Sequence, residues 1–149
     1  MARYTGTVPT VWSPEELFAY MADVRNFAEW DPGTRRVTQV AGDGPGPDAE
    51  YRVEVDAGGR ALELPYAVEV YDAPRRIVLE GSTRVFTLHD EITISPVRAG
   101  AAVTYDAEVE LRGVLRVLDP LLACSFRMNG DRAARGLRSV LAQGAPGAV

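Results

Sequence analysis

The sequence contains no lysine, a single histidine and a single cysteine, and these shortages exclude several kinds of site. Cys124 has no second cysteine with which to form an internal disulfide. One cysteine and one histidine, His89, cannot supply the ligands of a structural zinc site. We therefore expect no metal and no cofactor, and we expect Cys124 to be a small buried hydrophobic residue rather than a nucleophile.

Long apolar runs and a basic surface are missing as well. No segment approaches the roughly 20 consecutive apolar residues that cross a bilayer, and the N-terminal residues lack the apolar stretch of a secretion signal. Nucleic acids and anionic membranes require a basic face, whereas this chain has a net charge of −5 and scattered arginines. We expect a cytoplasmic monomer or weak homodimer, with no nucleic-acid partner and no stable membrane insertion.

What the sequence does contain is enough for one complete hydrophobic core. The chain has 149 residues, of which 46% are hydrophobic, and this size is typical of one domain. We expect a single domain over residues 1–149, with an ordered core from residue 3 to about residue 142 and a frayed C-terminal tail.

The N-terminal part predicts a strand followed by two short helices. Residues 3–12 alternate between polar and apolar positions, as a strand does. In "SPEE", Ser13 is an N-cap, Pro14 occupies the first helical position and Glu16 completes a capping box. The stretch "FAEW" then predicts a second short helix, which ends before Pro32.

From Arg35 onward the apolar residues recur at every second position, which predicts a series of strands. Gly58 and Gly59 are typical of a hairpin turn, and the other connections are also short, so we expect an antiparallel meander. Pro65 has no backbone N–H to donate, so we expect an irregularity there. The predicted strands cover residues 37–40, 51–57, 60–72, 75–82, 85–96 and 101–112.

A long helix is predicted from Asp119–Pro120 to about Gln143, and it carries one apolar stripe. The sheet has one apolar face, which must be covered. We expect the helix to cover it by packing Leu118, Leu122, Phe126 and Val140 against the sheet, while Arg127 and Arg138 stay exposed.

The chain resembles a known family in four stretches: "SPEELFAYMADVRNFAEWDPGTRRV", "YDAPRRIVLEG", "ITISPVRAGAAVTYDAEVEL" and "GDRAARGLRSVL". They are similar to the polyketide cyclase/dehydrase and lipid-transport branch of the START/Bet v 1-like (SRPBCC) superfamily. The resemblance implies an α+β helix-grip fold, in which a seven-stranded curved antiparallel sheet wraps around a long C-terminal helix. Two short helices lie between the first two strands of such a fold. It also implies a cavity for a hydrophobic ligand, without specifying chemistry.

One carboxylate interrupts the apolar face of the predicted sheet. In "VFTLHDEITISP", Asp90 shares its strand face with Leu88 and Ile92. Burial disfavours the charged form of a carboxyl, so we expect a raised pKa for Asp90 and polar partners beside it. Three interpretations remain open: a structural hydrogen bond, a ligand contact, or a general acid/base. His89 points to the opposite face, so it forms no dyad with Asp90 unless the strand contains a bulge.

Other polar or aromatic side chains are predicted to share the apolar surfaces. Tyr66 and Tyr105 lie on the same face as Asp90, either as core aromatics or as hydroxyl donors to Asp90 or to a ligand. Trp30 is either a core anchor or a wall of the cavity entrance. Asn129, together with Ser125, lies on the inward helix stripe and either contacts a ligand or pairs with the backbone.

Two arginines, Arg60 and Arg84, share the inward parity near strand ends and are either exposed ends or mouth residues that meet a ligand carboxylate or phosphate. The aromatase/cyclases that the chain resembles use an arginine deep in the cavity. No predicted strand has one in its middle, and this favours a binding function.

We therefore predict a protein that binds a hydrophobic small molecule: a lipid, sterol, isoprenoid or polyketide. One alternative is a polyketide cyclase, aromatase or dehydratase with Asp90, Tyr66 and Tyr105 as catalytic residues. A second alternative is a regulatory interaction module. The predicted cavity residues are Trp30, Tyr51, Val53, Leu64, Tyr66, Val68, Leu79, Phe86, Leu88, Asp90, Ile92, Tyr105, Ala107, Leu122, Phe126 and Asn129.

Overall fold

The computed structural model describes residues 1–145, which form one antiparallel sheet, one long helix and several short helices. The strands are β1 (Ala2–Thr10), β2 (Thr34–Ala41), β3 (Glu50–Ala57), β4 (Arg60–Asp72), β5 (Arg76–Ser82), β6 (Phe86–Val97) and β7 (Gly100–Leu111). The helices are α1 (Pro14–Met21), η1 (Val24–Asn26), α2 (Phe27–Trp30), η2 (Gly113–Leu118) and α3 (Asp119–Leu141), of which η1 and η2 are 3₁₀ helices.

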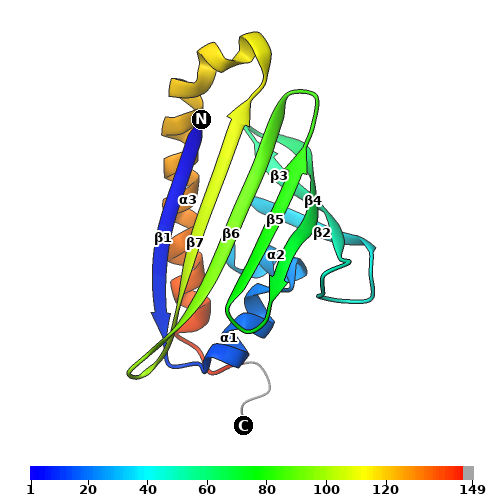
Figure 1. Ribbon diagram of the computed structural model, residues 1–149. Helices are drawn as coiled ribbons and strands as arrows, with labels where there is room; N and C mark the ends of the chain where they lie inside the picture. Colours follow the sequence, from blue (N-terminus) through cyan, green and yellow to red (C-terminus); the bar gives the residue numbers. More distant parts are fainter. Residues whose placement is uncertain (146–149) are drawn as a thin grey trace.

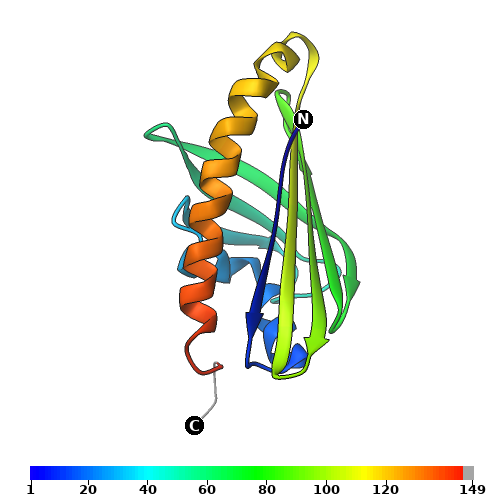
Figure 2. The ribbon, with the colours of Figure 1, turned by 90° about the vertical axis from the view of Figure 1, so that its left-hand side faces the viewer.

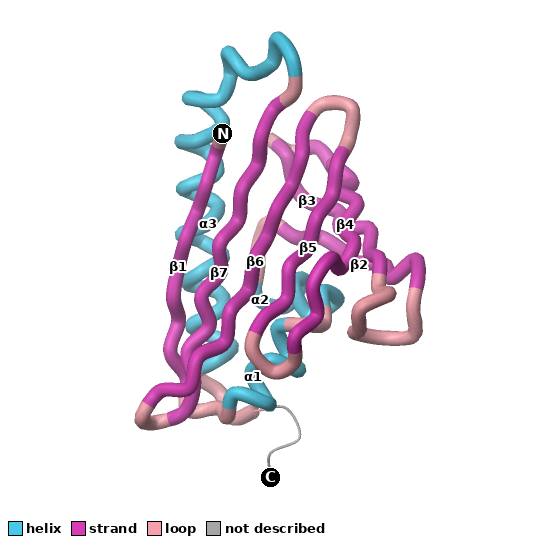
Figure 3. Tube along the Cα trace, in the orientation of Figure 1, coloured by secondary structure: helices cyan, strands magenta, loops and turns pink. Residues whose placement is uncertain are grey.

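The sheet is an antiparallel meander, and its two edge strands are β1 and β2. Its order is β1-β7-β6-β5-β4-β3-β2, so that β1 lies at one edge beside β7 and β2 at the other (Figure 1). Figure 2 shows α3 running along one side of the curved sheet, with the β3–β4 hairpin extending past it. The short helices α1, η1 and α2 follow β1, and α1 lies near the end where that strand finishes (Figure 3), whereas η2 follows β7 and leads into α3. This is the seven-stranded helix-grip fold that the sequence predicts.

Local sequence signals account for the element boundaries near the start of the chain. The Ser13 hydroxyl accepts the Glu16 N–H at 3.1 Å, and the Glu16 carboxylate accepts the Ser13 N–H at 3.0 Å. This capping box, with Pro14 in the first turn, fixes the start of α1. The β3–β4 turn uses Gly58 and Gly59 at φ of 64° and 88°, which residues with a side chain rarely adopt.

Two glycines of α3 allow the helix to approach the rest of the molecule closely. Gly130 faces the ring of Tyr4 on β1, and Gly136 faces the carbonyl oxygen of Trp30 at the end of α2. A side chain at either position would overlap these atoms. The helix therefore packs closely against β1 and α2. The glycines of α3 make no such close contact with β3 or β4.

Alternation of side chains separates a buried face of the sheet from a solvated face, most regularly on β6. On β6, Leu88, Asp90 and Ile92 are buried, and the residues between them are partly exposed. The outer face carries ion pairs between neighbouring strands, such as Arg76 with Glu91 at 2.7 Å. Exposed pairs of this kind contribute little to stability, about 0–1 kcal/mol each.

The prediction of an irregularity at Pro65 is wrong in its position. Pro65 stays in register opposite Arg52 on β3, and the register shift of β4 lies further along, between Val68 and Val70 in its pairing with β5. The β4–β5 ladder begins at Ala67, so the missing N–H of Pro65 faces no ladder position on that side.

The start of the long helix is more exposed than predicted. Leu118 is 45% exposed, and Cys124 is exposed rather than buried. Leu118 lies in η2, which extends beyond the start of β1 (Figure 2). Cys124 comes two residues after Leu122, which lines the cavity, and therefore lies on the opposite side of α3. Leu122, Phe126 and Val140 are half-buried, and Arg127 and Arg138 are exposed as predicted.

The C-terminal tail is described as far as residue 145. The carbonyl oxygen of Gln143 accepts the Trp12 indole N–H at 2.8 Å, and Ala145 packs against the core. This part of the tail is held by contacts, and the remainder of the predicted frayed segment, residues 146–149, lies outside the described residues.

Candidate functional site

A cavity of about 500 Å³ lies between the concave face of the sheet and α3. This volume is within the range of small-molecule sites, which is roughly 300–1,000 Å³. Apolar side chains from the sheet, α2 and α3 form most of its wall, among them Val53, Leu64, Phe86, Leu88 and Leu122. Because the apolar sheet face and the helix do not meet across this space, the fold leaves room for a hydrophobic molecule.

Asp90 is the most deeply buried polar group of the cavity wall, with 4% of its surface exposed. Its Oδ2 atom accepts a hydrogen bond of 2.6 Å from the hydroxyl of Tyr105 on the neighbouring strand. Burial raises the pKa of Asp90 to about 6, although the hydroxyls of Tyr105 and Tyr66 act in the opposite direction. The carboxyl therefore titrates close to neutral pH.

The two tyrosines keep their protons over the whole physiological range. Burial raises the pKa of Tyr66 and that of Tyr105 well above the ordinary value, and the charge of Asp90 raises both further. Both hydroxyls are thus hydrogen-bond donors beside one carboxylate. The arrangement can bind a polar group, and it can also transfer a proton through Asp90.

An aromatic cluster lies next to this polar group. The rings of Phe27, Trp30 and Tyr105 pack with centroid separations of 5.0 to 6.1 Å, and all three line the cavity. Within the described residues, the buried indole N–H of Trp30 has no hydrogen-bond partner. Trp30 is thus both a core residue and a wall of the cavity.

A second carboxyl, Asp31, also lines the cavity, between α2 and β2. Its oxygens accept the Gly33 N–H and the Thr34 hydroxyl, each at 2.9 Å. Burial raises the pKa of Asp31, and its charge in turn raises the pKa of Asp90. The ionisation of Asp31 therefore affects the ionisation of Asp90.

The structure brings most of the predicted cavity residues to the wall of one cavity. On α3, Leu122 and Phe126 face it, together with Asn129 and Ser125, which are exposed near its opening. The remaining predicted residues found on the wall are Trp30, Val53, Leu64, Tyr66, Phe86, Leu88, Asp90, Tyr105 and Ala107.

Four predicted cavity residues do not line it. Leu79 and Ile92 are fully buried in the core cluster, which also contains Leu17 and Met21 of α1. They have the inward parity, but α1 packs against β6 and fills this end of the sheet. Tyr51 is fully buried and Val68 is half-buried, both in the same packed region.

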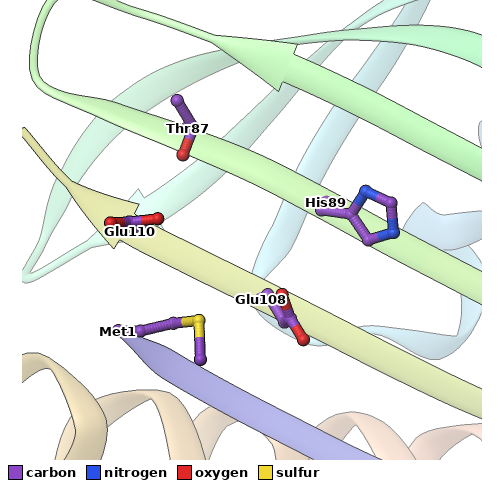
Figure 4. A pocket seen from close by; sticks show the side chains of 5 residues that line it. All are labelled: Met1, Thr87, His89, Glu108 and Glu110. Atoms are coloured by element: carbon purple, nitrogen blue, oxygen red, sulfur yellow. The ribbon is translucent and has the colours of Figure 1, made fainter.

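The charged candidates outside the cavity face solvent. Arg60 and Arg84 are exposed, and neither is among the residues that form the cavity wall, so the interpretation as exposed strand ends holds. His89 points outward, and its Nδ1 atom lies 2.9 Å from Glu80. Figure 4 shows it in a shallow depression of about 240 Å³ on the outer face, which it shares with Met1, Thr87, Glu108 and Glu110.

Sequence reasoning missed several residues of the wall. The "WDPG" context of Asp31 indicates a helix end, and the acidic residue beside a buried tryptophan is the signal in the sequence that points to the cavity wall. Phe27 and Tyr4 were missed because their roles depend on how α2 and β1 meet α3. Gly130 gave no sequence signal that it lines the cavity.

The described part of the chain lacks a metal-binding cluster and a membrane-spanning helix. Residues 1–145 contain no cluster of three or more His, Cys, Asp or Glu side chains placed to bind a metal ion. Among the helices described, none combines the length and the apolar character needed to cross a bilayer.

Comparisons with known proteins agree with this architecture. The family model described as polyketide cyclase/dehydrase and lipid transport matches residues 1–142. A START superfamily protein from Mycobacterium smegmatis has a TM-score of 0.77 at 18% identity, with 95% of this chain and 97% of that chain covered. The Zhui aromatase/cyclase from Streptomyces sp. R1128 has a TM-score of 0.72 at 15% identity, with 93% and 92% covered.

A plant protein has the same fold. Ginseng major latex-like protein 151 from Panax ginseng has a TM-score of 0.64 at 10% identity, with 95% of this chain and 98% of that chain covered. Comparison with curated protein sequences gave no match. At these identities the structural likeness establishes the fold, and the function depends on the residues of the cavity.

Proposed function

We propose, from the premise that this chain belongs to the polyketide cyclase/dehydrase and lipid-transport family, that it binds a hydrophobic small molecule between the sheet and α3. The ligand class is a lipid, sterol, isoprenoid or polyketide-like compound. The observation that carries the proposal is the cavity of about 500 Å³, whose wall is mainly apolar and contains a deeply buried polar group, Asp90 with its tyrosines. Such a site binds the body of a ligand by apolar contact and orients it by one hydrogen-bonding end.

Filling the cavity should weaken ligand binding without disturbing the fold. Ala133 faces the cavity from α3, so a phenylalanine at this position occupies the space that a ligand needs. We expect Ala133→Phe to lower the affinity for N-phenyl-1-naphthylamine, a neutral apolar fluorophore, by about tenfold or more, or 1.4 kcal/mol. Fluorescence titration measures the affinity, and circular dichroism verifies the helix content.

Ala19→Phe is the matched control, because Ala19 is exposed on α1 and does not border the cavity. This variant should bind the fluorophore as the unmodified protein does. Unchanged binding by Ala133→Phe, or no fluorophore binding by the unmodified protein, would contradict the proposal.

An enzymatic function is a second candidate, and the pairing of Asp90 with Tyr105 supports it. A carboxyl whose pKa is about 6 is poised to accept a proton near neutral pH. Tyr105 holds Oδ2 of that carboxyl, and Tyr66 offers a second phenol that can donate to a substrate carbonyl oxygen. The similar structure from Streptomyces is an aromatase/cyclase.

Proton exchange at a ketone separates this candidate from simple binding. We expect an enzyme of this kind to exchange the α-protons of 1-tetralone for deuterium in D₂O at least about tenfold faster than buffer, as positioned general bases accelerate such steps by 10²–10⁴-fold. NMR follows the loss of the α-proton signal. Asp90→Asn should remove the acceleration, and Glu63→Gln, on an exposed residue of β4, should keep it. A rate equal to that of buffer would leave binding as the function.

A further inference from the structure

The charged residues of the cavity wall all have the same sign. Asp31, Asp56 and Asp90 line the cavity, and no arginine or histidine of the described residues does so. The part of α3 that faces the cavity supplies small, apolar or neutral polar side chains, including Ser125 and Asn129. The wall is therefore acidic on the sheet side and uncharged on the helix side.

Among residues 1–145, one of these three carboxyls, Asp56, has a cationic partner. Asp56 lies at the end of β3, and its Oδ1 atom is 3.1 Å from the guanidinium of exposed Arg35. Asp31 and Asp90 form no ion pair within residues 1–145 and are stabilised by neutral donors: the Gly33 N–H, the Thr34 hydroxyl and the Tyr105 hydroxyl. A buried carboxylate with only neutral donors keeps much of its unfavourable desolvation energy, because no opposite charge offsets it.

This electrostatic environment opposes an anionic ligand. A carboxylate or phosphate brought into the cavity would lose its water, meet two like charges and find no arginine. A hydroxyl would donate to Asp90 without a charge of its own. An ammonium group would add a charge-assisted hydrogen bond and neutralise the carboxylate.

We propose that the ligand is a hydrophobic molecule whose polar end is an uncharged or cationic hydrogen-bond donor, a hydroxyl or an amine, bound at Asp90 between Tyr66 and Tyr105. This inference rests on the proposed binding function and narrows its ligand class, since it excludes free fatty acids and other anionic amphiphiles. Tyr66 and Tyr105 orient the Asp90 carboxyl, and Trp30 and Phe27 enclose the adjoining apolar segment. Asp31 extends the negative potential to the other side of the site.

The test compares three probes that share one alkyl chain: decylamine, 1-decanol and decanoate. Each displaces bound N-phenyl-1-naphthylamine at pH 7.5, where the amine is protonated and decanoate is ionised. We expect decylamine and 1-decanol to bind about tenfold or more tightly than decanoate, since hydrogen bonds to a charged group contribute about 1.5–3 kcal/mol. Decanoate that binds as tightly as decylamine would overturn the inference.

Variants test whether the preference for decylamine over decanoate depends on the carboxyls of the cavity. Asp90→Asn should narrow the gap between decylamine and decanoate to less than about threefold, because it removes the charge and keeps an acceptor oxygen. Glu63→Gln lowers the net negative charge equally on an exposed position, and it should leave the gap intact. Asp31→Asn removes a different negative charge from the cavity wall, and it should partly narrow the affinity gap between decylamine and decanoate.

The outcomes distinguish this inference from the function on which it rests. A gap that survives Asp90→Asn, or that Glu63→Gln abolishes, would show that selectivity comes from elsewhere on the protein and would overturn the inference. Fluorophore binding with no preference among the probes would refute the inference and leave the binding function standing. Absence of fluorophore binding would refute both.

Discussion

Replacing Gly136 by valine is expected to destabilise the protein by about 3 kcal/mol, at the upper end of the usual cost of overpacking. A Cβ atom at this position overlaps the carbonyl oxygen of Trp30, a backbone atom that cannot rotate away. The helix must therefore move away from α2, and this loosens the contact that fixes α3 over the cavity. Urea unfolding followed by circular dichroism measures the loss.

Gly46→Val is the matched control, because a side chain at Gly46 meets no atom within 4 Å and the residue has no positive φ. It should change the free energy of unfolding by less than about 0.5 kcal/mol, as surface substitutions usually do. Fluorophore affinity should fall only in the Gly136 variant, since that variant displaces a cavity wall. Equal stability of the two variants would show that α3 tolerates a wider separation from α2.

Strand parity made the polar group of the cavity predictable. Side chains alternate faces with a fixed period of two, and the ladders of β4, β6 and β7 keep their register around Tyr66, Asp90 and Tyr105. The facing of these residues follows from local sequence alone. Their mutual contact, by contrast, depends on the pairing of strands, which places Asp90 directly opposite Ala107 and brings Tyr105 within reach.

The extent of the cavity was not predictable from parity. Ile92 and Leu88 have the same inward parity on one strand, yet Leu88 lines the cavity and Ile92 is packed beneath α1. This difference depends on where the short helices rest, which involves contacts between segments distant in the sequence. The same limit explains Asp31, whose place on the wall follows from the docking of α2 against α3.

The apolar stripe predicts which face of α3 points inward, but it does not predict how far along the helix that face is buried. A period of 100° per residue places Leu137 inward, and Leu137 is buried. It also places Leu118 inward, although Leu118 lies in η2, which extends beyond the start of β1 (Figure 1), and 45% of this residue is exposed. A stripe identifies which face is apolar, and the length of the opposing sheet decides how much of that face is buried.

Asp90→Asn is expected to stabilise the protein at neutral pH and to have almost no effect at pH 4. Burial raises the pKa of Asp90 from 3.8 to about 6, so the folded state binds the proton more tightly than the unfolded state does. The stability that the protonated carboxyl provides is fully present below about pH 3.8 and is lost as the pH rises through about 6. A shift of about two units corresponds to about 3 kcal/mol.

Asparagine does not titrate and keeps an oxygen for the Tyr105 hydroxyl, so the variant lacks this loss. Urea unfolding of both proteins from pH 4 to pH 7.5 should give a stability difference that grows by roughly 2.5 kcal/mol in favour of Asp90→Asn, since part of the shift lies below pH 4. Comparison at each pH cancels most of the titration of groups that do not interact with Asp90. Glu63→Gln, at an exposed position, should give a difference that is flat with pH. A flat difference for Asp90→Asn as well would mean that water in the cavity solvates the carboxylate as fully as bulk solvent does, and that Asp90 costs the fold nothing.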